Sequence, residues 1–264
     1  MSDPISIGII RGGGWLGRAF AEAIVDAQII TAEHLTLSYR SGHPGFLPDA
    51  TWTRDNQELV DRSDVIIVSV RPQDWPAIEI SAYGKLAISV MAGTPLDQLA
   101  RRLNTDRVIR TLPNAAAAVR NSYTPWIGSQ GVTPNDRNII RRILEACGAA
   151  DEVKNEADID YLTGLTGSGP AFPALLATAM MDDAVGRGMS PDIARRSVSA
   201  VLIGTGKLLE ARKDSPNDIV QTFLDYRGTT AAAIEAMRAA GFEAAVRDGL
   251  AAALQKSVIM GQAS

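Results

Sequence analysis

The segment from Gly12 to Gly17 reads GGGWLG, which gives the spacing G-x-G-x-x-G. It follows an apolar run, Ile5–Ile10, and precedes a helix-forming stretch, Trp15–Ala27. Glycines at these positions let the chain turn tightly between a strand and a helix and approach a pyrophosphate at the helix N-terminus. The alternative is a purely structural turn. We favour a dinucleotide site whose turn is made by Gly12, Gly14 and Gly17.

The end of the next β-rich run indicates which dinucleotide would bind. An NAD site presents an acidic residue about 20 residues past the glycines, where it accepts a hydrogen bond from the ribose 2′-hydroxyl. This chain has Arg40 and Ser41 there and no acid. A guanidinium and a hydroxyl suit a 2′-phosphate, so NADP(H) is favoured over NAD. The alternative is an exposed arginine at a strand end.

Few residues could serve as an acid, a base or a metal ligand. His34 and His43 flank the run Leu35–Tyr39 and are poorly placed for catalysis, and Cys147 is the single cysteine. No His, Asp or Glu set has metal-ligand spacing, so no metal is expected. Hydride transfer to a carbon that is already electrophilic, such as an iminium carbon, needs neither a metal nor a histidine.

The elements that carry these residues alternate along the first half of the chain. Apolar β-rich runs are separated by helical stretches such as Leu96–Leu103. Near-continuous apolar strands spaced by helices predict a parallel sheet covered on both faces, in a doubly wound α/β arrangement. The expected strands are Ile5–Ile10, Leu35–Tyr39, Val65–Val70, Leu86–Val90 and Arg107–Arg110.

The second half is expected to be all helical. Segments rich in Ala, Leu, Met and Val have helical spacing, and Ser215-Pro216 has the residue types that open a helix. The predicted domains are therefore a dinucleotide-binding domain, residues 1–156, and a helical substrate and dimerisation domain, residues 157–264. The expected helices are Phe172–Gly188, Pro191–Lys213, Thr229–Ala240 and Phe242–Met260.

Charge and hydropathy exclude several classes of partner. Lys and Arg number 26 against 30 Asp and Glu among 264 residues, a net charge of −4 without a basic cluster, which argues against nucleic acid. The apolar runs are too short to cross a bilayer, and the N-terminus has no secretory pattern. We expect a cytoplasmic protein that acts on a small molecule.

Several segments, in order, resemble one known family. They are SDVIIVSVRPQ (residues 63–73), AISVMAG (87–93), VIRTLPN (108–114) and LTGLTGSGPAF (162–172). Together with the glycine segment they are similar to pyrroline-5-carboxylate reductase. The resemblance implies NAD(P)H-dependent reduction of a cyclic imine acid to proline. It also implies a nucleotide domain paired with a helical domain that interlocks into a dimer, often within larger rings.

The resemblance also assigns residues around the cofactor. Trp15 and Leu16 match the loop at the pyrophosphate, Asn56 an asparagine near the adenosine, and Ala92 a residue near the nicotinamide-side ribose. Further cofactor-binding residues implied by the matched segments are Val70, Arg71, Pro72 and Asn114.

The substrate loop departs from the family. Gly228, Thr229 and Thr230 match the residues that cradle the substrate carboxylate, and Thr230 matches the threonine near the imine. Asp225-Tyr226-Arg227 stands where the family has Ser-Pro-Gly, so Arg227 is either a new carboxylate ligand or an exposed residue of a drifted loop. We predict Thr230 as the catalytic residue; the alternative is that Thr229 or Thr230 caps a helix.

The departure leaves other functions open. The imine could be a piperideine or a pyrroline 2-carboxylate, or the chain could be a non-catalytic NADP-binding relative. A β-hydroxyacid dehydrogenase shares the two-domain plan but needs a lysine soon after the glycine-rich segment 167–169. The first lysine after that segment is Lys207.

Overall fold

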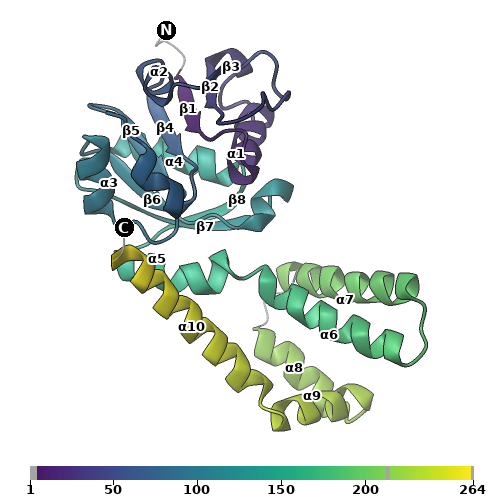
Figure 1. The fold of residues 1–264 in the computed structure, drawn as a ribbon. Helices are drawn as coiled ribbons and strands as arrows, with labels where there is room; N and C mark the ends of the chain where they lie inside the picture. Colours follow the sequence, from purple (N-terminus) through teal and green to yellow (C-terminus); the bar gives the residue numbers. More distant parts are fainter. Residues whose placement is uncertain (1–4, 212–214, 263–264) are drawn as a thin grey trace. The chain divides into compact units, whose positions relative to one another are not determined.

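The computed structural model describes residues 5–211 and 215–262, and in this part of the chain an eight-stranded sheet precedes a series of long helices (Figure 1). The strand order is β3-β2-β1-β4-β5-β6-β7-β8. The strands are β1 (Ile7–Ile10), β2 (Leu35–Ser38), β3 (Thr51–Thr53), β4 (Val65–Val68), β5 (Leu86–Ser89), β6 (Val108–Thr111), β7 (Ser122–Gly128) and β8 (Gly148–Glu152). The first six strands have the order of a dinucleotide-binding fold.

Helices connect these strands and cover the sheet. The α-helices are α1 (Trp15–Asp26), α2 (Asn56–Asp61), α3 (Leu96–Leu103), α4 (Pro134–Glu145) and α5 (Glu156–Leu162). Three short 3-10 helices are η1 (Ala32–His34), η2 (Pro72–Ala77) and η3 (Ala115–Val119), and η4 (Thr163–Gly167) is a π-helical turn after α5.

Each face of the sheet carries its own hydrophobic core. Side chains alternate between faces along a strand. Thus Val65 and Ile67 pack in the core with α1 and α4, whereas Ile66 and Val68 pack in the core with α2 and α3. Burial of both strand faces explains why the strands read as continuous apolar runs.

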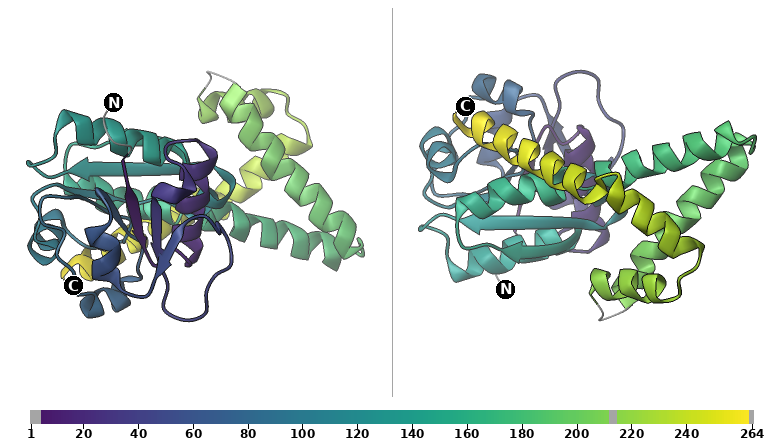
Figure 2. Two further views of the ribbon diagram at one scale, coloured as in Figure 1. Left: turned by 90° about the horizontal axis from the view of Figure 1, so that it is seen from above. Right: turned by 90° about the horizontal axis from the view of Figure 1, so that it is seen from below.

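The predicted α/β class and the five expected strands are confirmed, with ends shifted by one or two residues. Three strands were not expected: β3, β7 and β8. β3 is only three residues long, β7 contains Pro125, and β8 is polar and half exposed at the sheet edge. The five expected strands pair in parallel, as predicted, and the one antiparallel pair, β6 with β7, involves a strand that was not expected. Figure 2 shows the sheet unit from above and from below.

The helical half consists of α6 (Ala171–Gly186), α7 (Pro191–Ala211), α8 (Pro216–Asp225), α9 (Thr229–Ala239) and α10 (Phe242–Gln262). These match the expected helices, except that Lys213, the expected end of one of them, lies outside the described residues. Ser215 caps α8 in a capping box with Asp218. In the described part of the chain, none of the helices is both long and apolar enough to cross a membrane.

The chain divides into two compact units. The first unit comprises the chain up to Ser168 together with the part from Ala252 onward, and the second unit is Gly169–Ala251. Residues 157–168 pack with the sheet unit because Arg110 of β6 forms ion pairs with Glu156 and Asp160 of α5. Ser257 near the end of α10 also donates to Asp160. The assignment of residues 1–156 and 157–264 as functional domains stays a prediction.

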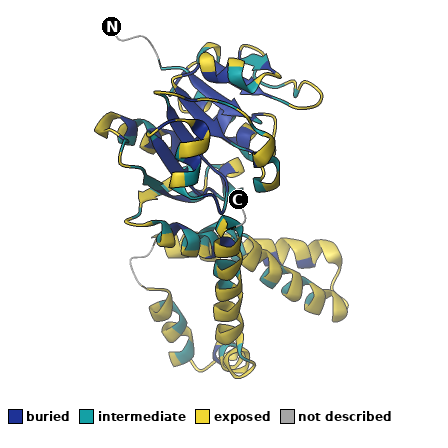
Figure 3. Cartoon of the chain, turned by 60° about the vertical axis from the view of Figure 1, so that its left-hand side comes forward, coloured by how far each residue is buried: buried dark blue, intermediate teal, exposed yellow. Residues whose placement is uncertain are grey.

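The second unit buries few of its own side chains. α6 packs on α7, and α8 on α9. Yet α6, which is mostly apolar, has no buried residue, and Leu175 and Ile203 are 72% and 60% exposed (Figure 3). A helix that is apolar on all sides normally lies inside a core. The helical unit of one chain therefore offers an uncovered apolar surface.

Candidate active site

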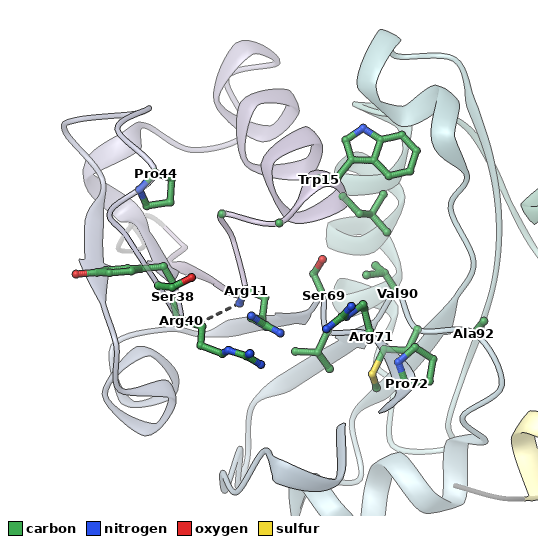
Figure 4. Close-up of a pocket in the computed structure, with 17 residues that line it drawn as sticks. Arg11, Trp15, Ser38, Arg40, Pro44, Ser69, Arg71, Pro72, Val90 and Ala92 are labelled. Carbon is green, nitrogen blue, oxygen red and sulfur yellow. Dashed lines mark hydrogen bonds between the residues drawn. The ribbon is translucent and has the colours of Figure 1, made fainter. Parts of the chain in front are cut away.

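A pocket of about 590 Å³ lies in the sheet unit where β1, β2, β4 and β5 end (Figure 4). In open α/β sheets, ligands bind at the carboxyl ends of the strands, where the strand order reverses. Here the reversal lies between β1 and β4. Nine predicted cofactor-binding residues line this pocket: Gly14, Trp15, Leu16, Arg40, Ser41, Val70, Arg71, Pro72 and Ala92.

Two of the predicted glycines lie behind the pocket and shape it. A Cβ on Gly12 would approach a Leu37 methyl to 2.6 Å, and one on Gly17 would approach the carbonyl oxygen of Arg11 to 2.6 Å. Gly12 therefore lets the turn lie close to β2, and Gly17 lets α1 lie close to the turn that follows β1. Gly14 is the N-cap of α1 and supplies no side-chain capping bond, so N–H groups of the first turn are available to an anion.

Three arginines of the pocket meet at one carboxylate. Asp74, in η2, lies 2.7 Å from the Arg11 guanidinium, 3.0 Å from that of Arg71 and 3.8 Å from that of Arg40. The hydrogen bond from Arg71 and then that from Arg11 outweigh the opposing effect of burial and hold the pKa of Asp74 below its ordinary value. The carboxylate is thus charged at neutral pH and can orient the guanidinium groups.

Eight further residues line the pocket without a role predicted from the sequence: Arg11, Gly13, Ser38, Tyr39, Pro44, Ser69, Val90 and Met91. Most adjoin an assigned residue, so the ends of the matched strands could have suggested them. Arg11 adjoins Gly12, but its residue type gave no signal, because the glycine pattern does not include an arginine. Its φ of 62° is a conformation that favours glycine, and the sequence does not reveal it.

Two asparagines predicted to bind the cofactor lie outside the pocket and form hydrogen bonds with other side chains and backbone groups. Asn56 opens α2 and accepts a hydrogen bond of 2.8 Å from Ser38, which in turn accepts one of 3.0 Å from the Arg11 N–H. Asn114 accepts from the Ala116 N–H and donates to the Thr166 carbonyl. Their direct contact with a cofactor stays a prediction.

The predicted substrate residues belong to the other compact unit, at the start of α9. Gly228 is the N-cap, so Thr229 and Thr230 lie in the first turn and neither is the capping residue. Arg227 precedes them with φ 50°, a left-handed conformation that costs a non-glycine residue free energy. Tyr226 is 84% exposed. The loop thus presents Arg227, two hydroxyls and the N–H groups of a helix N-terminus.

The remaining titratable candidates have structural surroundings. His34 bonds Thr31 at 2.9 Å, and the His43 ring lies tilted against that of Trp52 with ring centroids 5.1 Å apart. Burial raises the pKa of the Cys147 thiol to about 12, so this cysteine is not a thiolate nucleophile. Residues 5–211 and 215–262 contain no cluster of three His, Cys, Asp or Glu that could hold a metal ion.

Comparison with known proteins matches both halves of the chain. Residues 156–260 match the family described as pyrroline-5-carboxylate reductase dimerisation, and residues 6–93 match NADP oxidoreductase coenzyme F420-dependent. The pyrroline-5-carboxylate reductase of Methanosarcina acetivorans is 31% identical over 269 residues, which cover 97% of this chain and 98% of the relative.

Solved structures share the fold along the whole chain. A pyrroline-5-carboxylate reductase from Coxiella burnetii superposes with a TM-score of 0.88 at 22% identity, covering 98% of this chain and 99% of the other. Plasmodium falciparum pyrroline carboxylate reductase with NADP bound gives 0.85 at 24% identity, covering 97% and 98%. With a relative above 30% identity matched over nearly its whole length, the chain belongs to the pyrroline-5-carboxylate reductase family.

Proposed function

We propose that the protein reduces a small cyclic imine acid with NADPH, with 1-pyrroline-5-carboxylate as substrate and L-proline as product. The observation that carries this proposal is the arginine-lined pocket at the strand ends, in a chain that matches the reductase family along its length. It is an oxidoreductase acting on a C=N bond.

The pocket residues fit a phosphorylated dinucleotide. Gly13 and Gly14 leave the start of α1 open to a pyrophosphate, and Arg40 and Ser41 lie at the β2 end, where a ribose 2′ position is recognised. Three guanidinium groups sharing one carboxylate give this cluster a charge of +2. NADPH bound there supplies a hydride.

The α9 loop fits a small carboxylate. The N–H groups of Gly228, Thr229 and Thr230 begin a helix, whose dipole favours an anion. The Thr230 hydroxyl can donate one hydrogen bond and so orient the imine or a water that carries the proton to nitrogen. Arg227 adds a guanidinium that can pair with the carboxylate.

A second candidate is a reductase of another cyclic imine. It is favoured by one observation, the exposed and left-handed Arg227 in place of the family's glycine. A six-membered ring or a 2-carboxylate isomer would change both the size of the substrate and the position of its carboxylate relative to this loop.

NADPH oxidation against a panel of cyclic imines tests the function. We expect the highest kcat/KM with 1-pyrroline-5-carboxylate, and proline rather than pipecolate to be oxidised in reverse. A higher kcat/KM with a piperideine or a pyrroline 2-carboxylate would establish the second candidate instead. NADPH binding without oxidation by any imine would show a non-catalytic relative.

The preference for NADPH is expected to depend on Arg40. Its side chain is 71% exposed, and its distance of 3.8 Å from Asp74 is too long for a hydrogen bond. The guanidinium can therefore turn toward a phosphate. Arg40→Asp should raise the KM for NADPH at least about tenfold and leave that for NADH nearly unchanged. Arg141→Asp, an exposed site on α4 outside the pocket, is the control. Equal KM changes for both cofactors would contradict the assignment.

We expect a homodimer or larger homo-oligomer, because the helical unit exposes apolar side chains that a second copy can cover. Ile203→Arg on α7 should shift the mass measured by light scattering toward the monomer. Tyr83→Arg, at a site 80% exposed in the sheet unit, is the matched control and should leave the mass unchanged. A wild-type monomer at micromolar concentration would refute the expectation.

A further inference from the structure

Arg11 occupies a backbone conformation that its side chain disfavours. Its φ is 62°, the left-handed region in which glycine is the usual residue. Of the described non-glycine residues with positive φ, Arg11 alone lines the pocket. Such residues persist where the surrounding structure holds them, and they cluster at ligand sites.

Both ends of Arg11 are held by hydrogen bonds. Its backbone N–H donates to Ser38 Oγ at 3.0 Å, and its Nη2 donates to Asp74 Oδ2 at 2.7 Å. Its side chain is 26% exposed, against 71% for Arg40 and 67% for Arg71. Arg11 is therefore the fixed cation of the cluster, whereas most of the side-chain surface of the other two arginines is free.

The position of Arg11 indicates which phosphate it would meet. It shares Asp74 with Arg40, which follows β2, and its N–H is bonded to Ser38 of β2. The end of this strand is where a ribose 2′ substituent is recognised. The pyrophosphate has a separate site at the N–H groups of α1. Figure 4 shows the Arg11 and Arg40 side chains next to each other in the pocket.

We propose that Arg11 is a specificity-determining residue for the 2′-phosphate of NADP(H), and that Asp74 is the positioning residue that aims its guanidinium. The inference rests on the proposed binding of a dinucleotide in this pocket. A fixed, partly buried guanidinium loses little conformational freedom when it pairs with a phosphate. Arg40 then adds a second guanidinium from the solvent side.

Arg11→Gly separates the side chain from the fold, because glycine suits the backbone at this position. Titration calorimetry of the full-length protein should show the Kd for NADP⁺ weakened at least about tenfold and that for NAD⁺ changed less than about threefold. The Tm should stay within about 3 °C of wild type. Arg11→Gln, which keeps a side chain but not the charge, should lower the NADP⁺ to NAD⁺ affinity ratio in the same way.

Gln28→Gly is the matched control. Gln28 has φ 54°, is exposed after α1 and lies outside the pocket. Gln28→Gly should relieve the same strained backbone conformation without changing the Kd for NADP⁺ or for NAD⁺. Equal weakening of NADP⁺ and NAD⁺ in both Arg11 variants would overturn the inference, as would unchanged NADP⁺ binding. Failure of the wild-type protein to bind either dinucleotide would instead overturn the proposed function, and this inference with it.

Discussion

Replacing Arg110 by alanine is expected to lower the melting temperature of the protein by roughly 6–12 °C. Arg110 is 2% exposed in β6 and donates to Glu156 at 2.8 Å and to Asp160 at 2.6 Å. Removing one partner of a buried ion pair leaves carboxylates without their cation. Because Glu156 and Asp160 keep some contact with water, we take the low end of the usual cost, about 3 kcal/mol.

The same carboxylates hold other elements of the sheet unit. Glu156 also accepts from the Leu96 N–H at the start of α3, and Asp160 accepts from Ser257 of α10. The loss of Arg110 should therefore loosen α5 and the end of α10 together. Hydrogen exchange should show faster exchange in both segments, while β1 and β4 stay protected.

Two further variants make the Arg110 prediction specific. Arg101→Ala removes an arginine that is 72% exposed and paired with Asp97 one helical turn away, and it should change the Tm little. Combining Arg110→Met with Glu156→Gln and Asp160→Asn removes all three charges and should recover part of the lost stability. If Arg110→Ala and Arg101→Ala melt alike, the buried network does not hold these elements.

Thr230→Ala is expected to lower kcat/KM for the imine between roughly tenfold and a hundredfold, the effect of losing an orienting hydrogen bond of about 1–3 kcal/mol. The Thr230 hydroxyl has no hydrogen-bond partner among the described residues, so it is available to a substrate. The Kd for NADPH should stay nearly unchanged. Thr230→Ser keeps the hydroxyl and should recover much of the loss.

Stability distinguishes this role from a structural one. Gly228, not Thr230, occupies the N-cap position of α9, and alanine suits a helix better than threonine, so Thr230→Ala should not lower the Tm. Thr222→Ala on α8 is the control, because its hydroxyl bonds the Asp218 carbonyl within the helix. Wild-type turnover by Thr230→Ala would remove Thr230 from the reaction.

The features that the sequence predicts well are local. The glycine turn, the apolar strands and the caps of the long helices each depend on neighbouring residues, so spacing and residue type suffice. Two of the three strands missed, β7 and β8, show why the rest is harder. Both are partly polar or interrupted by Pro125, and they form because an existing sheet edge offers hydrogen bonds.

The sequence by itself determined the five apolar strands, the long helices of the second half, the glycine turn and the family motifs, because each is written in consecutive residues. Only the tertiary structure decided what surrounds Asp74. Arg11, Arg40 and Arg71 follow β1, β2 and β4, and the sheet order brings those three strand ends together. Arg11 and Asp74 are 63 residues apart in the chain. Their pairing depends on strand order and on a left-handed backbone angle, and neither has a signature in residue spacing.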